Sequence, residues 1–113
     1  MKTVEIKRNG ESLVRALNAN RYFPRLRGLI GRTLHPGEGL LLTPCNGIHT
    51  FFMGYPIDAA YLDSAGRVLR VDSELRRGRF CRPARGARRV LELNAKEAER
   101  LGIRPGDMLE VSS

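Results

Sequence analysis

The sequence has no tryptophan, only two cysteines, and only two histidines, His35 and His49. The cysteines, Cys45 and Cys81, are too few for a disulfide framework, and in a cytoplasmic protein they would stay reduced. A structural zinc site normally takes four ligands, often in close cysteine or histidine pairs, and the sequence has no such grouping. We therefore predict neither a disulfide-rich fold nor a metal site, and no cofactor.

Long apolar runs are also missing. No segment approaches the ~20 apolar residues that a membrane helix needs. The N-terminal stretch MKTVEIKRNG lacks the apolar region of a signal peptide. We expect a cytoplasmic protein with no membrane segment. The 113 residues are expected to form a single domain, residues 1–113, because a chain of this size can bury roughly 65% of its surface without crosslinks.

Lysine is scarce too, since Lys2, Lys7 and Lys96 are the only lysines among 20 basic residues, and the net charge is +8. Arginine suits phosphate and carboxylate groups because its planar guanidinium binds two oxygens at once. An anionic ligand or a protein partner is therefore plausible, although basic surfaces commonly serve solubility alone. Residues 72–87 show little periodicity and read as an exposed loop. Its candidate anion-binding residues are Arg76, Arg77, Arg79, Arg82 and Arg85.

Motifs for binding nucleotides or nucleic acids are absent from the sequence. There is no glycine-rich phosphate loop, no RNA-recognition aromatic motif and no zinc finger. Nucleic-acid binding would therefore rest on charge alone.

Twelve glycines and six prolines indicate many turns and hence many short strands. Asn9-Gly10 is a strong hairpin signal. The predicted strands cover residues 3–8, 11–16, 40–42, 48–53, 57–62, 68–71, 88–93 and 108–111. This pattern predicts a β-rich α+β fold, a small antiparallel β-sandwich or barrel with one or two short helices.

Two segments have helical patterns. Tyr22, Leu26 and Leu29 recur at helical spacing within residues 20–30. The second helix is predicted over Ala95–Leu101. Its expected N-cap is Asn94, with Glu97 at capping-box spacing, and Gly102 is expected to end it.

The run CNGIHTFFMGYPIDAAYLD, residues 45–63, concentrates the chemistry-bearing side chains. We predict a β-hairpin in which residues 48–53 pair with residues 57–62, so that His49 lies opposite Tyr61. Asp58 would then share a face with Thr50 and Phe52. Because an isolated buried charge is costly, we expect Asp58 to make a structural hydrogen bond or an ion pair with an arginine. Cys45 and His49 are most simply a small apolar filler and a hydrogen-bonded strand residue.

Three hypotheses on function follow. The leading one is a non-enzymatic binding or accessory module with a small polar pocket near the predicted hairpin. The candidate pocket residues are Arg27, Cys45, His49, Thr50 and Asp58. The second is a hydrolytic or metal-dependent enzyme that uses His49 with Cys45 or Asp58. The third is an anion or nucleic-acid binder that uses the arginine-rich loop. No catalytic residue is assigned.

An ordered set of short motifs resembles a known family. The set is Arg27-Gly28-Leu29, residues 37–42 (GEGLLL), residues 48–53 (IHTFFM), Pro56-Ile57-Asp58, Leu62-Asp63, Gly66, Leu91-Glu92-Leu93, Leu101-Gly102-Ile103 and Gly106-Asp107. It is similar to the domain of unknown function 192 family, also called uncharacterised protein family 0127, over roughly residues 20–111. The resemblance implies a compact, mainly β single domain and no established biochemical activity. The sequence departs from many relatives at Gly54-Tyr55, so a ligand inferred from those relatives does not transfer.

Overall fold

The computed structural model describes residues 2–20, 34–47, 55–76 and 78–113. Its elements are β1 (Lys2–Arg8), β2 (Glu11–Asn20), β3 (Glu38–Thr43), β4 (Ile57–Leu62), β5 (Val68–Leu75), β6 (Arg89–Asn94), α2 (Glu97–Leu101) and β7 (Glu110–Ser112). The helix predicted within residues 20–30 lies outside the described residues, apart from Asn20, which ends β2. Within the described part of the chain, no helix is long and apolar enough to cross a membrane.

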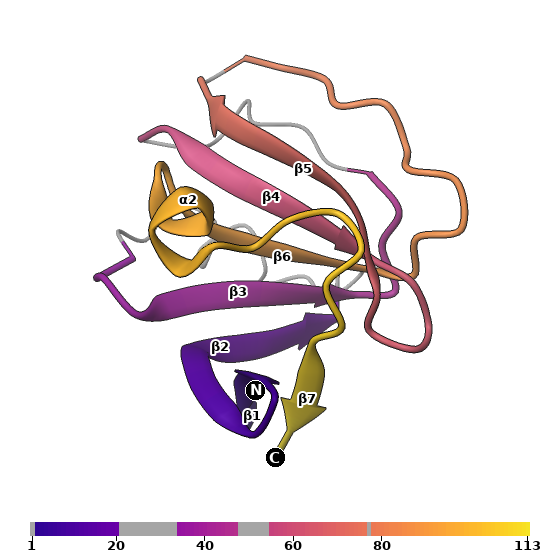
Figure 1. Ribbon diagram of the computed structural model, residues 1–113. Helices are drawn as coiled ribbons and strands as arrows, with labels where there is room; N and C mark the ends of the chain where they lie inside the picture. Colours follow the sequence, from indigo (N-terminus) through magenta and orange to yellow (C-terminus); the bar gives the residue numbers. More distant parts are fainter. Residues whose placement is uncertain (1, 21–33, 48–54, 77) are drawn as a thin grey trace.

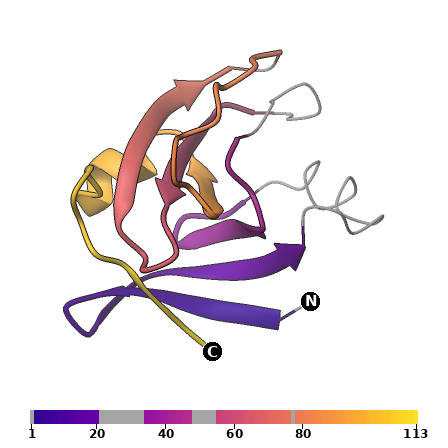
Figure 2. The ribbon, with the colours of Figure 1, turned by 90° about the vertical axis from the view of Figure 1, so that its right-hand side faces the viewer.

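The described strands form one curled sheet in the order β5-β4-β6-β3-β2-β1-β7 (Figures 1 and 2). The predicted β-rich fold with a short helix is confirmed, and the sheet has the shape of a half-barrel. One detail differs from the antiparallel prediction, because β2 and β3 pair in parallel. A parallel pair needs a connection of a dozen or more residues, and residues 21–37 separate the two strands in the sequence.

The first hairpin forms as predicted. Asn9 and Gly10 both have positive φ, 53° and 80°, as the favoured two-residue hairpin turn requires. Arg8 pairs with Glu11 directly beside this turn. The return strand is longer than predicted and runs to Asn20, because its second half pairs with β3.

The two edges of the curled sheet meet at one end. Val68, at the start of β5, donates its N–H to the Asp107 carbonyl and accepts from Gly106, each at 2.8 Å. Leu109 N–H donates to the Gly66 carbonyl at 2.9 Å. Gly66 has φ +95°, and a Cβ there would lie 2.1 Å from the Leu109 carbonyl oxygen. Only glycine fits this contact, which joins the segment before β7 to the start of β5.

Both faces of the central strands β3, β4 and β6 are buried. On one face a first core cluster, which includes Ile6, Leu41, Leu62 and Leu91, packs beneath α2. On the other face a second core cluster, which includes Leu42, Ile57, Tyr61 and Val90, is covered by Ala84 and Ala87. Every residue of β4 is buried as a result, the pattern of a strand covered on both sides.

The predicted pairing of residues 48–53 with β4 is wrong. The neighbours of β4 are β5 and β6, and Tyr61 pairs with Arg70 on one side and Val90 on the other. Both sides of β4 at Tyr61 are therefore occupied by neighbouring strands, so His49 cannot pair with Tyr61. Residues 48–54 themselves lie outside the described residues. The predicted turn at Asp63–Gly66 does join β4 to β5, and Asp63 Oδ1 accepts from the amides of Ala65 and Arg67, each at 2.9 Å.

The predicted Asn94 cap is also wrong. Asn94 ends β6, and its Nδ2 donates to the Leu34 carbonyl at 2.6 Å. The helix α2 begins at Glu97, after Lys96 in the left-handed region (φ 75°), and Lys96 makes no side-chain capping bond. Its C-terminal end is as predicted, since Gly102 has φ 67° and its amide bonds back to the Glu99 carbonyl at 3.0 Å.

Candidate anion-binding site

The segment between β5 and β6 has a three-residue period that the sequence pattern did not reveal. Cys81, Ala84, Ala87 and Val90 turn toward the second core cluster. The arginines between them are exposed. We call this exposed set the arginine ladder: Arg79, Arg82, Arg85 and Arg88. In Figure 1 the segment is the long orange loop at the right of the molecule.

Backbone hydrogen bonds hold the ladder against the sheet. Ala84 N–H donates to the Asn46 carbonyl and Arg88 N–H to the Leu62 carbonyl, each at 2.8 Å. The Arg88 carbonyl accepts from Cys45 N–H at 2.8 Å. Because the backbone is fixed in this way, the arginines project from a preorganised support, which lowers the entropy cost of binding.

The charge of the ladder is not balanced along its own segment, since residues 76–91 contain no aspartate or glutamate. Arg76, Arg79, Arg82 and Arg85 of the predicted anion-binding group are exposed. Arg77 lies outside the described residues. The structure adds Arg88, which the sequence-based set left out.

An open depression of about 400 Å³ lies where the ladder begins. Residues 72–75 of β5 form one wall and residues 79–82 the other, with Arg70 also in the lining. Phe80 on the ladder side is 78% exposed. The depression therefore combines guanidinium groups with an exposed aromatic ring.

A fixed polar cluster borders the depression. The Tyr61 hydroxyl donates to Asp72 Oδ2 at 2.9 Å, and Arg70 Nη2 donates to the same oxygen at 3.2 Å. The Arg70 guanidinium lies 4.2 Å from the centre of the Tyr61 ring, a cation–π contact, and Arg70 also donates to the Arg82 carbonyl. The Asp72 charge is thus compensated, and β5 is tied to the start of the ladder.

Two ionisable groups beside the depression, the Tyr61 hydroxyl and the Cys81 thiol, favour their protonated forms. Burial raises the pKa of the Tyr61 hydroxyl and also that of the Cys81 thiol. A thiol whose pKa is raised is a poor nucleophile at neutral pH, because the thiolate is the reactive form. The arrangement suits recognition by hydrogen bonds and charge better than covalent chemistry.

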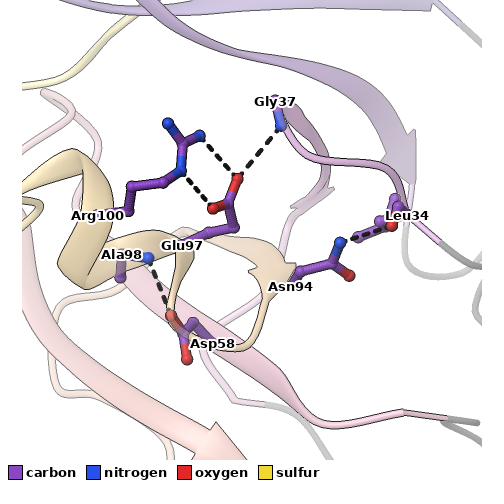
Figure 3. A network of polar contacts seen from close by, with 7 residues as sticks. All are labelled: Leu34, Gly37, Asp58, Asn94, Glu97, Ala98 and Arg100. Carbon is purple, nitrogen blue, oxygen red and sulfur yellow. Dashed lines mark hydrogen bonds and ion pairs between the residues drawn. The ribbon is translucent and has the colours of Figure 1, made fainter.

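Asp58 serves a structural network on the other face of the sheet (Figure 3). Its Oδ1 accepts from Glu74 N–H at 2.8 Å and its Oδ2 from Ala98 N–H at 2.9 Å. The structural hydrogen bond expected for Asp58 is confirmed, but its partners are backbone amides and not an arginine. Ala98 lies in the first turn of α2, so Asp58 takes the capping role predicted for Asn94.

Glu97 extends this network. Its carboxylate accepts from Arg100 at 2.6 and 2.9 Å and from Gly37 N–H at 3.2 Å. The Arg100 hydrogen bond lowers the pKa of Glu97. The contacts of Asp58, Asn94 and Glu97 join α2 to β4 and to residues 34–37, and we assign them to stability.

The predicted pocket residues do not all come together. Cys45 is buried in the second core cluster, where its Sγ donates to the Gly47 carbonyl at 3.0 Å. Asp58 belongs to the opposite face, because Ile57 and Ala59 face the second cluster and side chains alternate along a strand. Arg27, His49 and Thr50 lie outside the described residues.

Sequence reasoning missed Glu92. Only 3% exposed, it lies on β6 between Leu40 and Ala59, and burial raises its pKa to about 7. Its Oε2 has no hydrogen-bond partner in the described part of the chain. The alternation of Leu91, Glu92 and Leu93 is typical of a half-exposed strand, so only the covering of the second face could have revealed this burial.

No group of three or more histidine, cysteine, aspartate or glutamate side chains that could hold a metal ion occurs among residues 2–20, 34–47, 55–76 and 78–113.

Tyr61, Arg70 and Asp72 come together only because β4 and β5 are neighbours, and no sequence signal links them.

The family model of domain of unknown function 192 (DUF192), described as uncharacterized ACR, matches residues 4–111. The chain belongs to the DUF192 family. The resemblance noted in the sequence is therefore confirmed, and the match extends it from about residue 20 back to residue 4. The DUF192 model, being that of an uncharacterised family, assigns no activity.

Two solved structures share the fold of this DUF192 protein. A protein of unknown function from Novosphingobium aromaticivorans is 25% identical, with a TM-score of 0.80, over 96% of this chain and 83% of that one. A protein from Sinorhizobium meliloti described as a "putative transcription regulator" is 23% identical, with a TM-score of 0.78, over 96% of this chain and 92% of that one. No curated protein matches the chain.

Proposed function

We propose that this protein is a non-enzymatic binding module whose ligand carries a phosphate or carboxylate group. The observation that carries the proposal is the arginine ladder, exposed and held by backbone hydrogen bonds beside the depression. Arg79 and Arg82 belong to both features, so a ligand in the depression would lie within reach of both side chains.

Binding is favoured over catalysis by the state of the polar groups. The Cys81 thiol has a raised pKa, and the Tyr61 hydroxyl and Asp72 are engaged with each other. Both carboxylate oxygens of Asp58 accept from backbone amides. A nucleophile or general base needs a free, suitably ionised group within reach of substrate.

The pocket near residues 45–63 remains part of the proposal. Cys45 and Asn46 contact the backbone of the ladder at Arg88 and Ala84. Arg27, His49 and Thr50 stay candidates for the same ligand. The polar run that stood out in the sequence and the arginine-rich loop thus lie side by side at residues 45–46.

Isothermal titration calorimetry with inorganic phosphate and with citrate tests this function. We expect saturable binding that Arg82→Gln weakens roughly tenfold, the effect of losing one charge-assisted hydrogen bond. Arg104→Gln is the matched control, because Arg104 is exposed and lies in the turn after α2. Absence of binding, or equal weakening by both variants, would reject the proposed site.

A further inference from the structure

The ladder is longer than a small anion requires. The depression is lined by Arg70, Arg79 and Arg82, whereas Arg85 and Arg88 continue the positive charge beyond it. The four arginines are spread over residues 79–88, and the chain turns at residues 84–87, where Ala87 N–H donates to the Ala84 carbonyl at 3.0 Å. Their charge is therefore distributed along the segment and not gathered at one point. A polymer with several negative charges along its chain matches this distribution.

Phe80 distinguishes between polyanions. Its ring is 78% exposed and lies between Arg79 and Arg82 in the chain. Exposed aromatic rings beside a basic groove are stacking platforms for nucleic-acid bases. A peptide of acidic residues alone, such as polyglutamate, has no planar base to stack on the ring.

The charges of the two walls set the orientation of such a ligand. Asp72 and Glu74 line the β5 wall, and the Asp72 charge is compensated by Arg70. Glu74 is exposed and repels phosphate. The phosphates would therefore follow the ladder, while an uncharged base enters the depression beside Phe80.

A base must leave its stack to reach an aromatic ring, which favours single strands. Major-groove recognition of a duplex commonly uses a helix. The described helix α2 has five residues and packs on the opposite face of the sheet from the ladder.

We infer that the depression and the arginine ladder together form a binding site for single-stranded nucleic acid. This inference rests on the proposed anion-binding function and names its ligand class. The backbone phosphates pair with the ladder arginines, and one base stacks on Phe80.

Fluorescence anisotropy of a labelled 12-residue oligothymidylate tests the inference across a range of salt concentrations. The wild-type affinity should fall with a log–log slope of about −0.7 per phosphate contacted. The double variant Arg82→Gln, Arg85→Gln should make the slope shallower by about 1.4. Phe80→Leu should weaken binding roughly 5- to 150-fold at unchanged slope, because it removes stacking and no charge. Arg104→Gln should leave both the affinity and the slope unchanged.

Competition with polyglutamate of matched charge needs no variant. If polyglutamate displaces the oligonucleotide at equal charge concentration, or if Phe80→Leu binds like wild type, the ligand is an acidic peptide or a simple polyanion and the inference is overturned. Phosphate and citrate binding without tighter oligonucleotide binding would overturn it too and leave the proposed function standing. If nothing binds, both proposals fail.

Discussion

At the scale of single residues, Glu92 is the least expected feature of the molecule. Its carboxyl is wholly buried between β3 and β4, and Oε2 lacks a partner within the described ranges. Asp58 is also buried, but both of its oxygens accept backbone amides. Burial therefore has opposite effects on stability for the two acidic residues. Asp58 stabilises the fold through hydrogen bonds to both of its oxygens, whereas Glu92 is best tolerated in the protonated form.

We predict that the stability of the wild-type protein falls between pH 4.5 and pH 7 through Glu92. Below about pH 4.5 the carboxyl is protonated in both the folded and the unfolded chain. Above it the unfolded chain releases the proton while the folded chain keeps it, because the folded pKa is about 7. The loss levels off above pH 7 at roughly 3 kcal/mol, from 1.36 kcal/mol per pKa unit.

Urea unfolding of wild type and Glu92→Gln at pH 5 and pH 8 measures this effect. The glutamine variant should gain stability relative to wild type as the pH rises, whatever its stability at pH 5. Parallel pH profiles for the two proteins would contradict the prediction.

At the scale of elements, α2 shows how a five-residue helix persists. Isolated helices this short are unstable in water, and Lys96 provides no side-chain cap. The missing cap comes from β4 through Asp58, and Glu97 ties the first turn to Gly37. The capping-box spacing of Asn94 and Glu97 was misleading, because Asn94 continues β6 and bonds to Leu34.

We predict that Asp58→Ala destabilises the protein by about 3 kcal/mol, since it removes the acceptor of the buried Ala98 amide and of the part-buried Glu74 amide. Asp58→Asn should also destabilise, because its amide nitrogen cannot accept from a backbone N–H. Chemical denaturation measures both variants. Glu99→Ala, an exposed change in the same helix, should shift stability by less than about 0.5 kcal/mol. A similarly small shift for Asp58→Ala would show that the network contributes little.

At the scale of the whole molecule, the curled sheet depends on the contact that joins its two edges. Residues 106–109 and 66–68 hydrogen-bond to one another, although they lie at opposite ends of the strand order. In the same curled sheet the central strands β3, β4 and β6 are buried on both faces. The curling also leaves the segment after β5 to cover the second face with alanines and to present arginines outward.

We predict that Gly66→Ala destabilises the protein by more than about 3 kcal/mol, because the added Cβ overlaps the Leu109 carbonyl and the positive φ is strained. Gly106→Ala is a close control. Gly106 has φ +96° in the same contact but open space around a Cβ, so it should cost only about 1–2 kcal/mol. Thermal unfolding of the two variants compares them, and equal losses would show that closure does not depend on the Gly66–Leu109 approach.

The sequence by itself determined the β-rich class, the Asn9-Gly10 and Asp63–Gly66 turns, the end of α2 at Gly102 and the family. These are local features, and turn chemistry and glycine conformation follow from neighbouring residues. The sequence also indicated the arginine-rich loop as a candidate site, through composition alone.

Only the tertiary structure decided which strands are neighbours, which acid caps α2 and which polar groups meet. Tyr61, Arg70 and Asp72 meet because β5 pairs with β4. Cys45 and Asp58 are separated because their side chains lie on opposite faces of one sheet. The arginine ladder exists because small side chains every third residue lie against the second core cluster. Strand pairing and the covering of the faces of the sheet depend on contacts between residues that are far apart in the sequence. No local window of the sequence predicts them, because burial of the whole sheet decides between the alternatives.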